Sequence, residues 1–158
     1  MISSWFGRGR DDPADEAAPA PADPAPPVAP GRTFRDATDA YVRGIERSTK
    51  QYGSTLPVQA SVQLFTMVDA LDELLRHTLV APANVDEQIA IEFMVKDYIP
   101  STVSAYLASR ADQATKDALL ISQLGLLYDR VHSMMEAVYA HDSAQLEING
   151  RFLREKFG

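Results

Sequence analysis

The sequence predicts an all-α fold: an antiparallel helical bundle or a stack of helical hairpins with four to six helices, behind a disordered Pro/Ala-rich leader. From Thr33 onward, apolar residues recur at spacings of three and four, the period of a helix that buries one face. No segment of useful length alternates between apolar and polar residues as a half-buried strand does. Seven of the 10 prolines in the 158-residue chain fall in residues 11–31, which leaves about 127 residues for a core.

Residues 1–31 are the predicted leader, and residues 32–158 are the predicted bundle domain. Residues 11–31 combine their prolines with seven alanines, and they contain one branched aliphatic residue and no aromatic residue. Such a segment has little apolar surface to offset the entropy lost when a backbone becomes ordered. We therefore expect it to be a disordered spacer with polyproline II character.

The first ten residues carry a small apolar cluster beside two arginines. The predicted contact residues are Ile2, Trp5, Phe6, Arg8 and Arg10, and Trp5 is the only tryptophan of the chain. This composition is typical of a weak anchor for an anionic membrane surface or of a short motif that docks on a partner protein. A third interpretation is that the cluster packs back onto the bundle domain, and the sequence leaves all three open.

The first three helices are predicted from one apolar face each. The predicted inward residues are Phe34, Tyr41, Ile45 and Tyr52 in a helix over 34–52; Val58, Val62, Phe65, Val68, Leu71, Leu75 and Leu79 in a helix over 56–80; and Val85, Ile89, Phe93 and Met94 in a helix over 85–98. Thr33 is the predicted N-cap of the first helix. Pro82 separates the second helix from the third, and Asn84 with Glu87 predicts a capping box.

Pro100 is predicted to end or kink the third helix near Ile99, because a proline disfavours the α conformation in the residue before it. A short helix should follow, with Val103, Tyr106 and Leu107 facing inward. The sequence therefore predicts that Pro100 sets a turn between two helices.

The longest periodic stretch lies beyond a polar connection at 109–114. Its apolar residues follow steps of four and three, as in the seam of a coiled coil: Leu120, Leu124, Leu127, Val131, Met134 and Val138. The next apolar residues, Leu146, Leu153 and Phe157, are shifted from this seam. Either one helix runs to the C-terminus or the chain bends between 141 and 150. The basic residues Arg151 and Arg154, with Lys156, suit the negative end of a helix dipole.

Composition and motifs argue against most catalytic and nucleic-acid-binding classes. The net charge of −7 provides no broad basic surface, so no nucleic-acid partner is predicted. The chain has no cysteine, which excludes disulfides and thiolate metal sites. Asp129 with His132 and Glu73 with His77 are the nearest matches to a metal-binding pair, and both are incomplete. We predict no catalytic residue, no metal ligand and no cofactor.

The sequence also predicts where the protein resides. No apolar run approaches the roughly 18 residues of a membrane-spanning helix, and the N-terminus lacks the apolar stretch of a secretion signal. Alanine richness and 11 arginines against four lysines are typical of a GC-rich bacterial source. We expect a bacterial cytoplasmic protein, peripheral to the inner face of the membrane if residues 1–10 bind it.

A Tyr98-Ile99-Pro100 step, followed by Tyr106 and Leu107 and later by the long seamed helix, resembles the bacterial helical proteins grouped as XpaC-like. These are named for 5-bromo-4-chloroindolyl phosphate hydrolysis. The resemblance covers about residues 93–157. It implies an all-helical fold, phosphate-ester hydrolysis and a tie to the cell envelope or to stress, and it transfers no catalytic residue to this chain.

Two functions are compatible with the sequence. The sequence favours a non-enzymatic interaction or scaffold protein that binds a protein partner or a second copy of itself. The alternative is an XpaC-like phosphate-ester hydrolase or an accessory of one, with a site assembled by tertiary contacts. Carboxylates converging with His77 or His132 in one cleft would favour the hydrolase, whereas dispersed histidines would favour the interaction protein.

Overall fold

The computed structural model describes residues 30–157, which form helices joined by short connections. The elements are α1 (Pro30–Gln51), α2 (Val58–His77), α3 (Val85–Phe93), η1 (Met94–Tyr98), α4 (Ile99–Ala108) and α5 (Gln113–Phe157). No strand occurs among the described residues. The all-α prediction is therefore confirmed.

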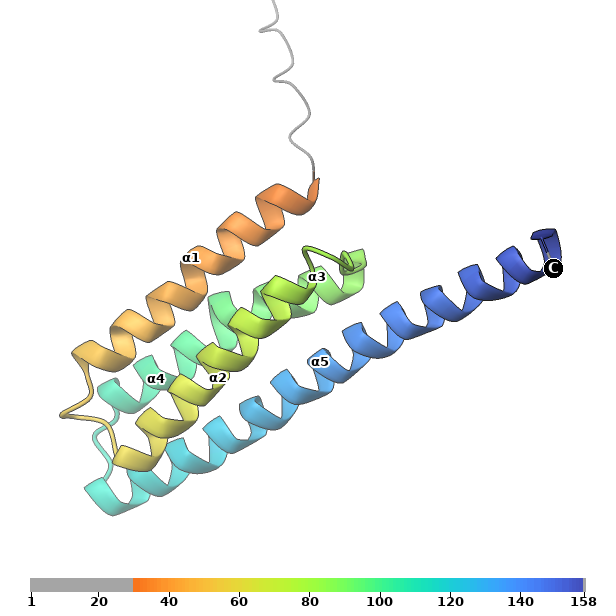
Figure 1. Ribbon diagram of the computed structural model, residues 1–158. Coiled ribbons are helices and arrows are strands. Elements are labelled where there is room, and N and C mark those ends of the chain that lie inside the picture. Colours follow the sequence, from red (N-terminus) through yellow and green to blue (C-terminus); the bar gives the residue numbers. More distant parts are fainter. Residues whose placement is uncertain (1–29, 158) are drawn as a thin grey trace, which may run out of the picture.

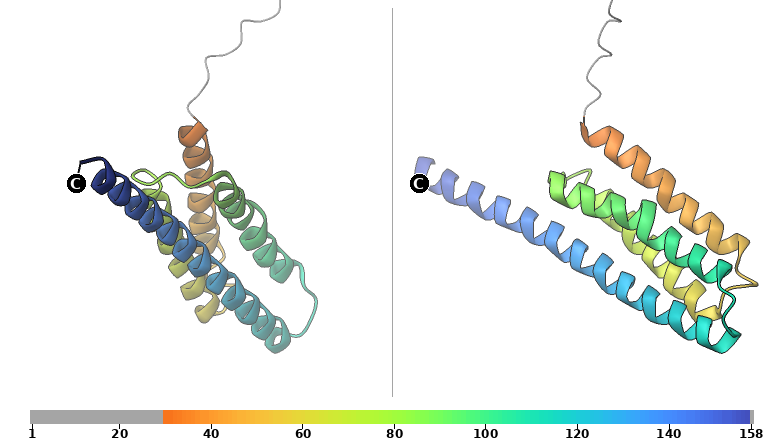
Figure 2. Two further views of the ribbon diagram at one scale, coloured as in Figure 1. Left: turned by 90° about the vertical axis from the view of Figure 1, so that its right-hand side faces the viewer. Right: turned by 180° about the vertical axis from the view of Figure 1, so that it is seen from behind.

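Because α3, η1 and α4 follow one another without a break, the described chain forms four helical rods. Each rod runs antiparallel to the one before it (Figure 1). The α2 helix packs against α1 and α5, while the α3–η1–α4 rod contacts both α1 and α5 (Figure 2). At 45 residues α5 is more than twice as long as the 20-residue α2, and its C-terminal part extends beyond the other rods.

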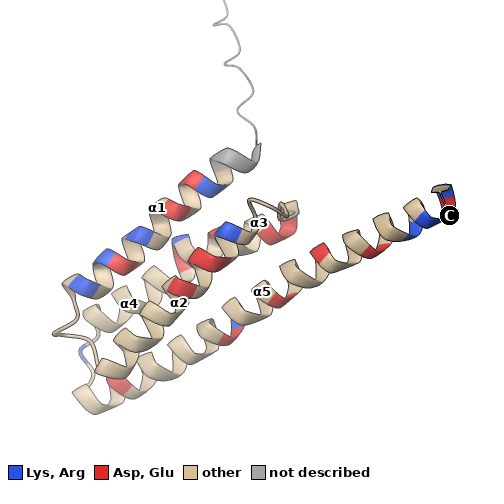
Figure 3. Cartoon of the chain, viewed as in Figure 1, with Lys and Arg blue, Asp and Glu red and all other residues tan. Residues whose placement is uncertain are grey.

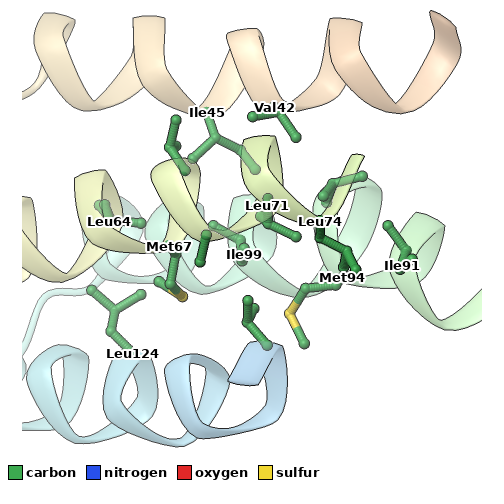
Figure 4. Packing of buried hydrophobic residues seen from close by; sticks show 14 of the residues in the cluster. Val42, Ile45, Leu64, Met67, Leu71, Leu74, Ile91, Met94, Ile99 and Leu124 are labelled. Atoms are coloured by element: carbon green, nitrogen blue, oxygen red, sulfur yellow. The ribbon is translucent and has the colours of Figure 1, made fainter. Parts of the chain in front are cut away.

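The core lies where the four rods meet, and α2 contributes most to it (Figure 4). Its fully buried residues follow steps of four and three: Ala60, Leu64, Met67, Leu71 and Leu74. The predicted stripe on α2 was partly wrong, because Val58, Val62, Phe65 and Leu79 are exposed whereas Val68, Leu71 and Leu75 are buried. The segment carries two apolar stripes, and contact with α1 and α5 buries the one that contains Ala60.

The α1 helix begins at Pro30, so Thr33 lies inside the helix and is not its N-cap. A proline is tolerated in the first helical turn because the N–H groups there have no acceptor within the helix. Phe34 and Ile45 are buried as predicted, but Tyr41 is exposed. Val42 is buried in its place.

Two threonines of α1 are also buried in the core. The Thr38 hydroxyl donates to the Phe34 carbonyl at 2.7 Å, and the Thr49 hydroxyl donates to the Ile45 carbonyl at 2.8 Å. Each hydroxyl is satisfied within its own helix, so that the side chain can be buried without leaving a donor unpaired.

The prediction that Pro100 separates two helices was wrong, because the chain stays helical from 85 to 108. The η1 segment is one turn of π-helix, in which the Ile99 N–H donates to the Met94 carbonyl five residues back. Pro100 stands directly after it, in the first turn of α4. A π-turn inserts one extra residue into a helix, which changes the backbone pairing at the point where the proline lacks its N–H.

The π-turn also explains why the predicted face of the third helix was wrong. Val85, Ile89 and Phe93 are exposed, whereas Met94 is buried as predicted. The other buried residues are spaced by four: Ile91, Val95, Ile99 and Val103. Four residues exceed one α-helical turn, so such a series would spiral around a regular helix. The extra residue of the π-turn takes up part of this drift and keeps the series facing the core.

Other predicted local features are confirmed. Asn84 and Glu87 form the capping box, with the Glu87 N–H donating to Asn84 Oδ1 at 2.9 Å and the Asn84 N–H donating to Glu87 Oε2 at 2.8 Å. The seam of the long helix is buried except at Leu127, which is partly buried. Of the two alternatives for the C-terminal region, a single helix to Phe157 is the observed one.

Candidate interaction surface

The sequence-predicted functional residues fall in two groups. The contact residues Ile2, Trp5, Phe6, Arg8 and Arg10 lie outside the described residues, and their role stays a prediction. The motif residues Tyr98, Pro100, Tyr106 and Leu107 all lie on the α3–η1–α4 rod.

Tyr106 is buried and joins three parts of the bundle. Its hydroxyl donates to Asp117 Oδ1 of α5 at 2.7 Å and accepts from Gln113 Nε2 at 2.9 Å. The Thr55 carbonyl, in the turn after α1, lies 3.2 Å from the same oxygen. Burial, and then the hydrogen bond to Asp117, raises the pKa of Tyr106. Through these hydrogen bonds, Tyr106 connects α4 to the turn after α1 and to the start of α5 at one end of the bundle.

The other motif residues do not assemble a chemical site. Tyr98 is exposed beside Phe93, with ring centroids 6.3 Å apart, so it does not dock the helix as predicted. Pro100 and Leu107 line a groove of about 350 Å³ between α1 and α4. Small residues of α1 such as Gly44 keep this groove open.

His77 lies between α2 and α5, close to one carboxylate. Its Nε2 atom lies 3.8 Å from Asp142 Oδ2, and its ring meets Tyr139 edge-on with centroids 4.5 Å apart. The Tyr139 hydroxyl donates to Glu73 Oε1 at 3.4 Å. Burial, and then the nearby Glu73 charge, raises the pKa of Tyr139. These contacts tie α2 to α5 just before α5 leaves the bundle.

The other two histidines have separate neighbours. His141 Nδ1 lies 3.8 Å from Glu87 Oε2, and His132 packs edge-on against Tyr128 with centroids 4.4 Å apart. His132 is exposed. In the described part of the chain, no group of three or more His, Asp or Glu side chains is placed to hold a metal ion. The histidines are thus dispersed among different partners.

The most distinctive surface is the C-terminal part of α5, residues 141–157, which we call the overhang. It is about 26 Å long at 1.5 Å per residue, and it extends past the end of the bundle (Figure 1). Five large apolar side chains on it are each more than half exposed: Leu146, Ile148, Phe152, Leu153 and Phe157.

These five residues continue the face with which α5 packs on the bundle. On a helix that turns by about 100° per residue, all five point within about 100° of the direction of the buried Val138. On the same basis Glu147 and Arg154 point away from that direction. The overhang therefore carries a bundle-facing side beyond the point where the bundle ends.

The end of the bundle adjacent to the overhang is also apolar. Four exposed side chains in and beside the α2–α3 connection form what we call the end surface: Leu79, Val80, Val85 and Ile89. Val80 and its neighbours enclose a hollow of about 200 Å³ with Val138, His141 and Asp142 of α5. The apolar surface therefore runs from the end surface towards the overhang.

Charge is distributed unevenly along the overhang (Figure 3). Its tip carries Arg151, Arg154 and Lys156 against one acidic residue, Glu155, whereas Asp142 lies at its root. The first turn of α3, at the adjacent end of the bundle, carries Asp86 and Glu87.

Sequence reasoning missed the overhang, although one signal for it was present. The shift of Leu146, Leu153 and Phe157 from the seam was interpreted as a change of register within a covered helix. What distinguishes an uncovered helix is the length of its neighbours, which only the three-dimensional arrangement provides.

Comparison of the chain with models of known protein families, with curated proteins and with solved structures returned no match. The XpaC-like resemblance therefore rests on the motif residues alone. Among the helices that the structure describes, none combines the length and the apolar character that crossing a bilayer requires.

Proposed function

We propose that this protein is a non-enzymatic interaction protein, whose bundle presents the overhang and the end surface to a protein partner. The observation that supports this function is that the bundle-facing side of α5 continues to Phe157, well beyond His141 and Asp142, which contact Glu87 of α3 and His77 of α2. Exposed apolar patches of this kind, bordered by charges, are typical of interaction sites. An amphipathic helix is a common recognition element in such sites.

The arrangement of the histidines gives the hydrolase alternative less support. His77 and His141 each meet a single, different carboxylate at 3.8 Å, Asp142 and Glu87 respectively, while His132 packs on Tyr128. Phosphate-ester hydrolysis needs a nucleophile or metal together with groups that stabilise the developing negative charge. The contacts of His77 are better accounted for as links between α2 and α5.

The same proposal places the protein in the bacterial cytoplasm and assigns residues 1–10 a second contact at an anionic membrane surface. Its support is compositional, since Trp5 and Phe6 stand beside two arginines at the end of a proline-rich spacer. The bundle would then work as a scaffold with one contact on the overhang and another on the leader.

The interaction function is tested by affinity capture with the full chain, a Leu146→Asp/Leu153→Asp variant and a Leu126→Asp control. Leu126 lies on the same helix within the bundle and is 69% exposed, close to the 65% of Leu146. We expect the overhang variant to lose the proteins that the full chain retains, and the control to keep them. Equal retention by all three, with unchanged helical content by circular dichroism, would contradict the proposed function.

A further inference from the structure

We infer that the overhang binds the overhang of a second copy of this chain, with the two segments antiparallel and overlapping over residues 141–157. This inference rests on the proposed function, because it names the occupant of the same surface. The apolar face, the charges and the residue at the midpoint of the overlap each support this pairing.

The apolar face requires a helical partner of about its own length. Leu153 and Leu146 project on the side where α2 packs on α5, and Phe152 projects on the other side, where α3 packs. A partner helix lying over this face restores the kind of contact that α5 makes inside the bundle. The overhang of a second copy has this length and this apolar face.

The charges select the antiparallel orientation. In a parallel pair Lys156, which points towards the interface, would lie beside Lys156 of the second copy, and the two charges would repel one another. In the antiparallel pair each tip reaches the end of the other bundle, where Asp86, Glu87 and Asp142 are found.

Full overlap also sets the register. Lys156 of one copy then lies level with Asp142 of the other, and both project within about 40° of the bundle-facing direction. Phe157 lies level with His141, next to the hollow that Val80 lines. The tip of the second copy then lies beside the end surface, whose four side chains are exposed in the described part of the chain.

Asn149 lies at the midpoint of this overlap and points within about 20° of the interface direction. In the antiparallel register it stands level with Asn149 of the second copy. A polar residue at one interior position of a helix pair fixes register and orientation, because any shift leaves its amide unpaired. Asn149 is thus the specificity residue of the pairing.

Sedimentation velocity of the purified full chain, over roughly 1 to 200 µM, tests for the second copy. We expect a concentration-dependent dimer that the Leu146→Asp/Leu153→Asp variant loses and the Leu126→Asp control retains. A monomer at every concentration overturns the inference, and so does a dimer that survives in the overhang variant. In either case the proposed function still stands if affinity capture depends on the overhang, so the two failures are distinguishable.

Orientation is tested by cysteine crosslinking, for which the chain is suited because it has no native cysteine. We expect Asn149→Cys to form disulfide dimers with itself under mild oxidation. Lys156→Cys should not crosslink with itself but should crosslink with Asp142→Cys when the two variants are mixed. Efficient crosslinking of Lys156→Cys with itself would indicate parallel helices and overturn the inference.

Discussion

Leu124 illustrates how the long helix holds the bundle together at the scale of single residues. Its side chain is fully buried in the core beside Leu64 and Met67 of α2 (Figure 4), whereas Leu127 is only partly buried. Leu124→Ala should lower the free energy of unfolding by about 2–5 kcal/mol, because it removes buried methyl groups and leaves a cavity. A urea titration measures this decrease, and Leu127→Ala should lower the free energy of unfolding by clearly less. Equal costs would contradict the observed burial.

The raised pKa of Tyr106 predicts that the stability of the folded protein depends on pH. Its pKa is raised from 10.0 in the folded protein, so the folded state holds this proton more tightly than the unfolded state does. The contribution of this proton to the free energy of unfolding is complete below pH 10. It is lost as the pH rises through the raised pKa of Tyr106. Tyr106→Phe should therefore cost about 0.5–1.5 kcal/mol at neutral pH, and less than that under alkaline conditions.

Guanidinium titrations of wild type and Tyr106→Phe between about pH 8 and pH 11 measure this change. The control is Tyr98→Phe, which alters an exposed hydroxyl and should leave stability unchanged. A difference between wild type and Tyr106→Phe that stays constant across this range would argue against the role of the Tyr106 hydroxyl proton.

At the scale of elements, the π-turn makes the region around Pro100 testable. Deleting the exposed Lys96 removes one residue from η1 and would restore a regular α-helix, in which Pro100 clashes with the carbonyl four residues back. We expect the free energy of unfolding to fall by about 3 kcal/mol or more in a denaturant titration. Adding Pro100→Ala to the deletion should recover the part of this loss that comes from the clash, but not the part that comes from turning Ile99 and Val103 away from the core. If the double variant is no more stable than the deletion alone, accommodation of the proline is not the reason for the π-turn.

The existence of the helices could be predicted from sequence, but several of their buried faces could not. The seam from Leu120 to Val138 was predicted because six apolar residues share one spacing with no competing stripe. In α2 the competing stripe through Val58 and Val62 is as apolar as the buried one, which begins at the small Ala60. Hydrophobicity cannot choose between two such stripes, and the choice is made by the positions of α1 and α5.

The motif around Pro100 shows a different limit. A proline inside an apolar pattern predicts a helix end because regular α-helical pairing cannot continue through it. The chain continues because η1 changes that pairing locally. A π-turn is a single extra residue with no composition of its own, so only the spacing of four between Ile91, Val95 and Ile99 indicates it in the sequence.

At the scale of the whole molecule, the candidate surface arises from a mismatch of lengths. The α2 helix ends at His77, and its partner rod begins at Val85, while α5 continues to Phe157. Each residue of the overhang is unremarkable in a sequence that is read as a continuous bundle helix. Its exposure follows from where the neighbouring helices end, and this is why the sequence predicted an interaction protein without identifying the surface.

The leader provides the last prediction, which concerns a contact at the other end of the chain. Trp5 is the only tryptophan, so its fluorescence reports on residues 1–10 alone. Vesicles with anionic lipid should shift its emission to the blue, because Trp5 and Phe6 would insert while Arg8 and Arg10 bind lipid phosphates. Added salt should weaken the shift, since it screens the charges.

Vesicles of neutral lipid and a Trp5→Ala variant in vesicle sedimentation are the controls for this experiment. An unchanged spectrum, with sedimentation unaffected by Trp5→Ala, would exclude the membrane contact and leave a protein-docking motif or a passive tail. An emission that is already blue-shifted without vesicles would show that Trp5 packs on its own bundle. Gly44→Leu then tests whether the packing site is the groove of about 350 Å³ between α1 and α4, because filling this groove would reverse the shift only if Trp5 occupies it.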